Sequence, residues 1–339
     1  MSATLRVLGA AMATLFLIVA GSGGAAEITH IAVPGGKNGV GFDDLVFDPV
    51  LHRVVVPAAQ RGQLVLIDPG NLSFATINGF SVVQDYSRGH ADGVTSADAA
   101  GDKLLATDRT SRRLCFVDPK SKTILRTLPL GGGPDYVRFV ESTAAAWVTE
   151  PERERIEIFP LITDSTAQSA RSIPLAIPGG PESLVIDDSH DRAYTNLWSH
   201  QTIAIALDSR QIVARFGNGC AGSRGLALDP VRGFLFVGCA EGRLAVLDST
   251  TGKLLGEVSG GPGVDIIAYS PTQRQVYLPS ARGGSLAIVD IAASGAPTVV
   301  RSVPIPKGAH CVAADDSGSA YLCDPATGQI VVIRNPSTP

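Results

Sequence analysis

The sequence predicts an all-β protein, a seven-bladed β-propeller built from four-stranded blades. A strand–turn–strand motif such as "GPDYVRFVESTAAAWVTE" returns seven times, with 41 to 49 residues between successive copies. The 37 Gly and 22 Pro supply the turns that many short strands require, and the chain shows no amphipathic run long enough for helical repeats. A period in the forties made only of short strands is typical of propeller blades.

Each repeat shows the same internal order. A first strand follows a Gly/Pro-rich loop, and a turn of the "DPVRG" or "DDSHD" type leads to a second strand such as "FLFVG" or "RAYTN". A third strand, for example "LAVLD", often ends in Asp, and a fourth such as "GKLLGEV" leads into the next loop. One repeat therefore forms one blade. The first strands begin at seven leading residues: Asp43, Asp92, Asp135, Glu182, Arg224, Asp265 and His310.

The last repeat lacks a strand of its own. It contains three strands and then ends at "IVVIRNPSTP", whereas the segment "EITHIAVPGG" near the N-terminus resembles the fourth strand of other blades. We therefore expect the N-terminal strand to pair with the last blade, which closes the ring and hides its edges. Residues 27–339 are expected to form this single propeller domain.

The first 26 residues resemble a secretory signal peptide. Arg6 precedes the apolar run "VLGAAMATLFLIVA" and the small residues "GSGGAA", which predicts cleavage after Ala26. The apolar run is short for a membrane span of about 20 residues, so an uncleaved anchor is the less favoured alternative. The expected location is the periplasm or the extracellular space, where disulfides persist.

The second strands carry a resemblance to a known family. "AWVTE", "AYTNL" and "VYLPS" make nearly the whole chain after residue 26 similar to the YVTN-type β-propeller repeat family, with "AYTN" the nearest match to its motif. The segment "CAGSRGLALDPVRGFLFVGC" is similar to a blade of exported members, including the Cys pair. The resemblance implies export and a seven-bladed propeller. It implies no single activity, because members are variously uncharacterised, ligand-binding or surface-associated.

The five cysteines are interpreted as two disulfides and one free thiol. Cys220 precedes the first strand of blade five and Cys239 follows the second, so the hairpin brings them together. Cys311 and Cys323 lie on the two strands of the first hairpin in blade seven, where cross-strand neighbours can bond. Cys115 is left as a small buried apolar side chain. No CxxC spacing occurs, which disfavours a metal cluster built from cysteine.

The leading residues are the main candidate site. First strands line the channel of a propeller, so we expect these side chains to form a ring at one mouth, with His90 nearby in the loop "VVQDYSRGHA". Crowded carboxylates raise one another's pKa or recruit a cation. In one interpretation the Asp side chains cap neighbouring loops around a water-filled channel. In the other, Asp43, Asp92 and His310 hold a divalent metal ion.

Cationic and aromatic residues complete the predicted mouth. Arg224 breaks the acidic pattern and could pair with Glu182 or Asp265, or hold an anionic ligand. Trp198 in "NLWSHQT" falls in a mouth loop, where its ring could pack or contact a ligand or partner. A small anionic or zwitterionic ligand suits the mixed charge. Further arginines are expected on this face: Arg61, Arg109, Arg112, Arg153 and Arg282.

Composition and motifs narrow the classes of function. A net charge of −4 without any Lys/Arg run makes nucleic acid an unlikely partner. The Gly-rich loops precede strands rather than helices and make no phosphate cradle, and neither GxSxG nor CxxCH occurs. The favoured function is an exported, non-catalytic scaffold that binds a small molecule or a protein at its mouth. The alternative is a metal-dependent, lactonase-like hydrolase with one divalent ion and Glu182 as base.

Overall fold

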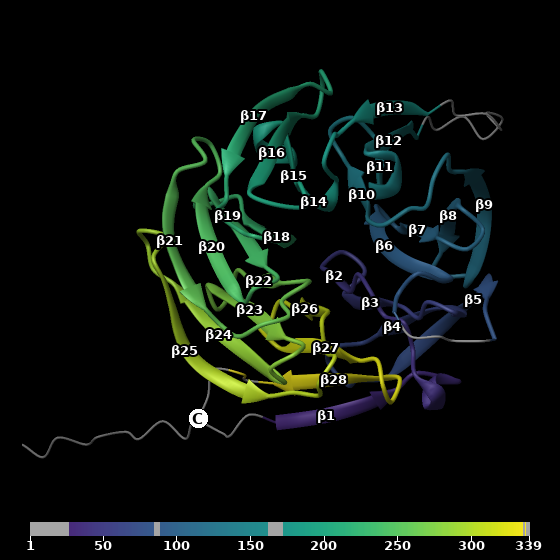
Figure 1. The fold of residues 1–339 in the computed structure, drawn as a ribbon. Coiled ribbons are helices and arrows are strands. Elements are labelled where there is room, and N and C mark those ends of the chain that lie inside the picture. The colour runs from purple at the N-terminus through teal and green to yellow at the C-terminus, as the bar shows by residue number, and fades with distance from the viewer. Residues whose placement is uncertain (1–26, 85–88, 162–171, 335, 337–339) are drawn as a thin grey trace, which may run out of the picture.

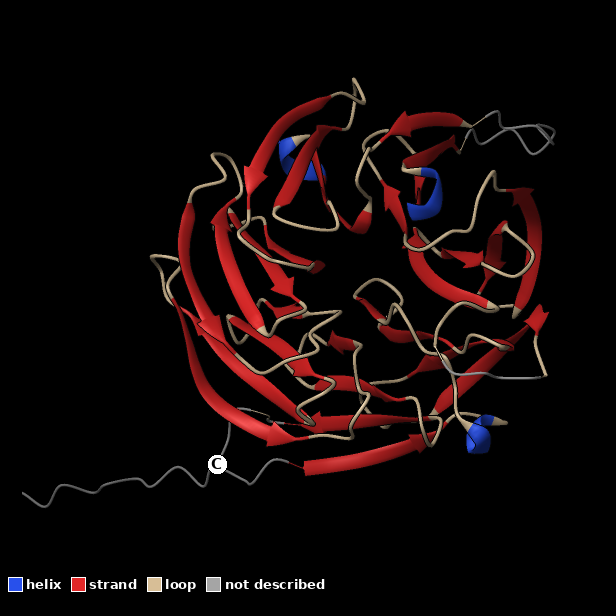
Figure 2. Ribbon diagram, viewed as in Figure 1, coloured by secondary structure: helices blue, strands red, loops and turns tan. Residues whose placement is uncertain are grey.

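In a computed structural model, which describes residues 27–84, 89–161, 172–334 and 336, the chain forms seven four-stranded antiparallel sheets arranged around an axis. Figure 1 shows the first strand of each blade nearest the centre and the fourth strand at the rim. Figure 2 shows that strands dominate, with three short 3₁₀ helices in the connections. These helices are η1 Gly36–Asn38, η2 Pro151–Arg153 and η3 Asp188–His190. The predicted fold class is confirmed.

The strands of the first three blades follow one another in chain order. Blade 1 contains β2 Val46–Asp48, β3 Arg53–Pro57, β4 Arg61–Ile67 and β5 Phe74–Val82. Blade 2 contains β6 Val94–Ala100, β7 Lys103–Asp108, β8 Arg113–Asp118 and β9 Thr123–Pro129. Blade 3 contains β10 Val137–Val140, β11 Ala145–Glu150, β12 Arg155–Pro160 and β13 Ile173–Ala176.

The second half of the ring follows the same plan. Blade 4 contains β14 Glu182–Asp187, β15 Arg192–Asn196, β16 Gln201–Ala206 and β17 Ile212–Gly217. Blade 5 contains β18 Ser223–Asp229, β19 Phe234–Cys239, β20 Arg243–Asp248 and β21 Leu254–Ser259. Blade 6 contains β22 Ala268–Ser270, β23 Gln275–Ser280, β24 Ser285–Ile291 and β25 Pro297–Pro304. Blade 7 contains β26 Val312–Ala314, β27 Ala320–Asp324, β28 Gln329–Arg334 and β1 Glu27–Ala32.

The N-terminal strand closes the ring as predicted. Strand β1 pairs antiparallel with β28, in a register that runs from Glu27 opposite Arg334 to Ala32 opposite Gln329. In Figure 1, the purple β1 lies beside β28 at the outer edge of the last blade. The predicted signal peptide, residues 1–26, lies outside the described residues. Among the described residues, no helix has the length and apolar character needed to cross a membrane.

Burial follows the position of each strand within its blade. The second strands β11, β19 and β23 are buried along their whole length, because both faces pack against neighbouring blades. The outer strand β25 alternates between partly buried and exposed residues, because only one of its faces has a neighbour. Trp147 on β11 is fully buried in an apolar cluster that blades 3 and 4 share.

Both predicted disulfides are present. Cys220 and Cys239 are bonded with their Cα atoms 5.2 Å apart, and Cys311 and Cys323 with theirs 5.6 Å apart. Cys115 is free and buried on β8, and burial raises the pKa of its thiol to about 12. Both disulfides join the first hairpin of a blade close to the channel, so they fix the position of the residues that follow them.

Candidate functional site

A ladder of hydrogen bonds between blades defines the ring of leading residues. The backbone N–H of Gly225 donates to the carbonyl of Asp265 at 2.7 Å, and that of Ile266 donates to the carbonyl of His310 at 3.0 Å. The residue after one leading residue thus contacts the leading residue of the next blade. This contact holds neighbouring first strands together around the channel.

The hydrogen bonds between blades place Thr95, rather than Asp92, at the ring position of blade 2. The N–H of Asp44, which follows the leading Asp43, donates to the carbonyl of Thr95 at 3.1 Å. Between Asp92 and Thr95 the chain turns at Gly93, where φ is +72° and an added Cβ would lie 2.0 Å from the carbonyl oxygen of Ala59. Because β6 begins after this turn, Asp92 lies three residues before the ring position in the sequence.

Asp43 is the most strongly paired carboxylate of the ring. It is buried, with His90 Nδ1 at 2.9 Å and an Arg109 guanidinium nitrogen at 3.4 Å. Arg109 also contacts Asp135 and donates to the carbonyls of His90 and Pro134, at 2.8 and 2.7 Å. Burial favours a raised pKa for Asp43, but the charges of His90 and Arg109 outweigh it and lower the pKa. Asp43 is therefore ionised and fully engaged.

His90 is a cation at neutral pH. The negative charge of Asp43 raises the pKa of His90 to about 9, against the opposing effect of burial. A histidine in this state cannot accept a proton at pH 7, so the Asp43–His90 pair does not act as a general base. Its Nδ1 faces Asp43, while its Nε2 has no partner among the described residues.

His310 is held by two carbonyl groups. Its Nδ1 lies 2.8 Å from the oxygen of Gly308, and its Nε2 lies 2.9 Å from the oxygen of Phe42. Both ring nitrogens thus face carbonyl oxygens of the protein. Each nitrogen already has a partner within the protein, so His310 is not free to bind a metal ion. The His90 and His310 rings lie side by side with their centroids 5.6 Å apart.

The predicted metal ligands do not converge. Within the described ranges, His, Cys, Asp and Glu side chains gather closely enough for one ion in two groups, His310–Cys311–Cys323 and Cys220–Cys239–Glu241. Each group contains a disulfide, whose sulfur atoms are not available as thiolates. Asp43, Asp92 and His310 do not form such a group. These residues therefore do not fit the divalent ion that the alternative function requires.

The leading carboxyls of blades 4 and 6 have no such partners. Glu182 is 7% exposed, and its side chain makes no hydrogen bond or ion pair with any residue that the structure describes; the same holds for the carboxyl of Asp265. Burial, together with the nearby charges of Asp135 and Asp265, raises the pKa of Glu182 to about 9. Burial also raises the pKa of Asp265, and that of Asp135 to about 6. Glu182 is thus neutral at pH 7.

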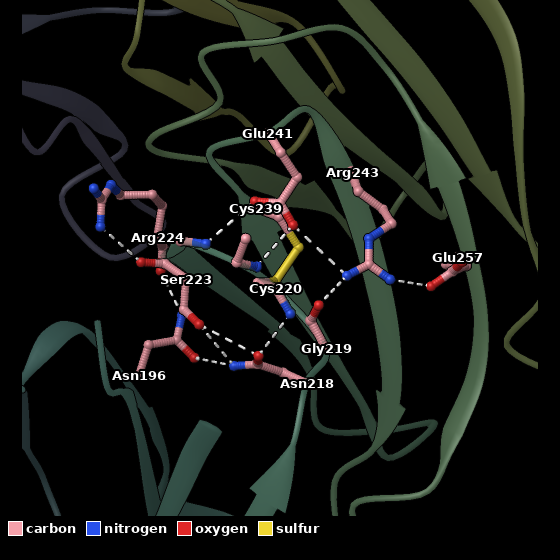
Figure 3. Close-up of a disulfide and its surroundings, with 12 residues drawn as sticks. Asn196, Asn218, Gly219, Cys220, Ser223, Arg224, Cys239, Glu241, Arg243 and Glu257 are labelled. Carbon is pink, nitrogen blue, oxygen red and sulfur yellow. Dashed lines mark hydrogen bonds and ion pairs between the residues drawn. A yellow bond between two sulfur atoms is a disulfide. The ribbon is translucent and has the colours of Figure 1, made fainter. Parts of the chain in front are cut away.

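Arg224 stacks on an aromatic ring instead of pairing with either acid proposed for it. Its guanidinium carbon lies 5.6 Å from the centre of the Trp198 ring, and one nitrogen donates to the carbonyl of Ser223 at 3.0 Å. Figure 3 shows how this residue is positioned beside the Cys220–Cys239 disulfide. The amide of Asn196, the Asn of "AYTN", donates to the carbonyl of Arg224 and links blade 4 to blade 5. This contact gives the motif residue a structural role.

Two cavities open beside these residues on the mouth face. The first has a volume of about 550 Å³, and its polar lining is provided by Asn38, His90, Asp265, Lys307 and His310. The second has a volume of about 480 Å³ and is lined by residues of blades 2 to 4: Ala91, Arg109, Arg112, Gly133, Pro134, Pro151, Glu152 and Trp198. Trp198 is 43% exposed. The segment that carries His90 and Ala91 separates the two cavities.

Sequence reasoning missed three features of the channel. Arg109 was expected only as one of several mouth arginines, yet it joins two blades through Asp43 and Asp135. Lys307 lines the first cavity from the loop before blade 7. Deeper in the channel, Arg138 binds both oxygens of Asp44, at 2.6 and 3.0 Å. The contacts of Arg109 and Arg138 join residues of different blades, so the sequence of a single repeat cannot reveal them.

Comparison with known proteins supports the fold but does not indicate a function. No protein-family model matches the chain, and neither does any curated protein. A chain of the mitotic checkpoint complex is similar over 98% of both chains, with 14% identity and a TM-score of 0.74. Virginiamycin B lyase from Staphylococcus aureus is similar over 91% of this chain and 99% of its own, with 12% identity and a TM-score of 0.70. Identities this low show a shared propeller fold alone.

Proposed function

We propose that this chain is an exported, non-catalytic binding protein that holds a small polar ligand in the 550 Å³ cavity at its mouth. One observation carries the proposal: both histidines that line this polar cavity are already engaged within the protein. His90 pairs with Asp43, which Arg109 also contacts, and His310 lies between two carbonyls. A cavity with polar walls whose histidines are engaged in this way suits binding.

Export is supported by two independent features. The leader-like pattern of residues 1–26 is typical of secreted chains, and the structure contains two disulfides, which are stable in oxidising compartments. The solved structures with this fold include an interaction complex and a lyase, so the fold itself favours neither class. The hydrolase alternative finds no support in the arrangement of its three predicted ligands.

The test is a binding screen on the mature chain, residues 27–339. Small anions, cations and zwitterions are screened by thermal shift, and hits are measured by titration calorimetry. Lys307→Gln removes a cation from the cavity wall and should weaken binding about tenfold. Lys253→Gln, on the exposed turn after β20, is the matched control and should bind like the wild type.

Two results would contradict the proposal. Turnover of any member of a lactone and ester panel, lost in His310→Ala, would make the mouth an enzyme site. The absence of any small-molecule ligand would exclude the cavity as a binding site and leave protein partners at the mouth loops, around Trp198, as the remaining function.

A further inference from the structure

The second cavity on the mouth face has an aromatic wall. Trp198, which is 43% exposed, lines it together with the rings of Pro134 and Pro151. The backbone of Trp198 is held on both sides, because its N–H donates to the carbonyl of Gly179 at 2.8 Å and its carbonyl accepts from the N–H of Ser223 at 3.0 Å. An indole ring that is fixed by its loop and exposed beside a cavity can stack on a planar ligand.

The contact with Arg224 leaves this wall available. The guanidinium carbon of Arg224 lies 5.6 Å from the centre of the Trp198 ring, yet Arg224 is not among the residues that line the cavity. Arg224 therefore contacts the ring from outside the cavity and helps to fix its orientation. The ring surface that faces the cavity stays open to a ligand.

The two arginines that line the cavity differ in what they can still bind. Arg109 is committed to the protein, because its nitrogens contact Asp43 and Asp135 and donate to two backbone carbonyls. The side chain of Arg112 is exposed and makes no hydrogen bond or ion pair with any residue that the structure describes. A free guanidinium binds a carboxylate through two parallel N–H donors. The cavity thus offers one site for an anionic group.

The cavity has room for a ligand that uses both features. Its volume of about 480 Å³ lies in the range of small-molecule sites. At Gly133, which also lines it, an added Cβ would meet no atom within 4 Å, and the φ of this residue is not in the left-handed region. The space beside Gly133 is therefore open, and a larger side chain can be placed there without backbone strain.

We propose that the second cavity is a separate binding site for an aromatic carboxylate, with the aromatic ring of the ligand stacked on Trp198 and its carboxylate bound by Arg112. The prolines cover the remaining apolar surface of the ligand. This inference goes beyond the proposed function and does not depend on the ligand of the first cavity, since the two cavities share no lining residue.

The experiment titrates the mature chain with benzoate and 2-naphthoate, each beside its carboxamide, and with cyclohexanecarboxylate. Calorimetry should show that the aromatic acids bind about tenfold or more tightly than the carboxamides and more tightly than the saturated acid. Binding should also quench the fluorescence of Trp198. This quenching should vanish in Trp198→Leu, because the remaining Trp147 is fully buried in the core.

Three variants test the cavity itself. Arg112→Gln should weaken binding by about tenfold to a hundredfold, whereas Arg113→Gln, the exposed neighbour outside the lining, should not. Gly133→Leu should block binding by filling the open space. Gly217→Leu is its matched control, because a Cβ there also meets no atom within 4 Å and Gly217 lies outside the cavity.

The third variant reports the charge of the ligand. Glu152 is the acid that lines the cavity, and it is exposed. Glu152→Gln should tighten binding of an aromatic acid by about twofold to fivefold, because it removes a repulsive charge. Weaker binding in this variant would show that the site selects a cation and would overturn the inference.

Other outcomes separate this site from the first cavity. If the carboxamides bind as tightly as the acids, or if no aromatic acid binds, the inference is wrong. If an aromatic acid binds equally well to Arg112→Gln and Gly133→Leu but poorly to Lys307→Gln, it occupies the first cavity, so this inference fails while the proposed function stands. Thermal melting of each variant verifies that it is folded.

Discussion

Glu182 illustrates how one side chain links stability to the site. It lies on the first strand of blade 4, where its carboxyl is buried among Asp135, Asp265 and Arg224. Its ordinary pKa of 4.5 is raised to about 9 in the folded protein. Between these two pH values the folded state holds a proton that the unfolded state has lost, so the contribution of Glu182 to stability falls as the pH rises.

Replacing this residue by its neutral isostere should therefore stabilise the protein at alkaline pH. We expect the unfolding free energy of Glu182→Gln to exceed that of the wild type by at least about 1 kcal/mol at pH 8, and the difference to shrink toward pH 4.5. Urea denaturation at both pH values measures it, with Glu27→Gln as the control. A difference that does not change with pH would show that Glu182 is ionised in the folded protein.

Residue-level prediction depends on whether a side chain belongs to the repeated motif. Asp43 and Asp265 each lie three residues before the first strand of their blade, and Glu182 is the first residue of β14, so the motif located all three near a first strand. Asp92 was assigned wrongly, since the turn at Gly93 shifts the start of β6 relative to the other blades. The role of Arg109 could not be predicted, because its partners come from different repeats.

At the scale of elements, strands and hairpins were the most predictable features. Gly/Pro-rich loops and alternating apolar residues mark each strand, and a hairpin places residues at its two ends opposite each other. Both disulfides follow from this geometry, because each one links a residue just before a first strand to the second strand of the same blade. The pairing of β1 with β28 was also predictable from the pattern of repeats, because the last repeat contains three strands and the N-terminal segment resembles a fourth.

The contribution of β1 can be tested within one strand. Ile31 is 6% exposed and belongs to the apolar cluster of blades 7 and 1, whereas Ile28 on the same strand is 48% exposed. Ile31→Ala should lower the unfolding free energy by about 2–5 kcal/mol, through lost burial and the cavity left behind. Ile28→Ala should change it by less than about 1 kcal/mol. Equal effects in chemical denaturation would mean that β1 does not pack as described.

At the scale of the whole molecule, the ring depends on its first strand. A chain that begins at Val33 lacks β1 and leaves β28 as an unpaired edge. We expect its melting temperature to fall by about 5 °C or more, and its apparent mass in light scattering to rise with concentration, because exposed edges associate. An excess of a peptide spanning residues 27–34 should reverse both effects. An unchanged melting temperature and apparent mass would show that blade 7 is stable with three strands.

The way the whole ring is assembled explains why function was harder to predict than fold. Because the motif occurs in seven copies, each copy independently predicts a blade. A wrong interpretation of one copy therefore leaves the predicted architecture unchanged. The cavity at the mouth is built from loops that differ between blades, such as those carrying His90 and Lys307. Each of these residues occurs once, and its partners are determined only when the ring closes.

The pairing of Glu27 with Arg334 also sets the order in which the protein can mature. During synthesis β1 emerges first, yet its partner β28 emerges last, after six other blades have been made. Any chain cut short by abortive translation or proteolysis therefore retains a loose N-terminal strand and an incomplete blade. Completion of the ring therefore requires the chain to be made as far as β28.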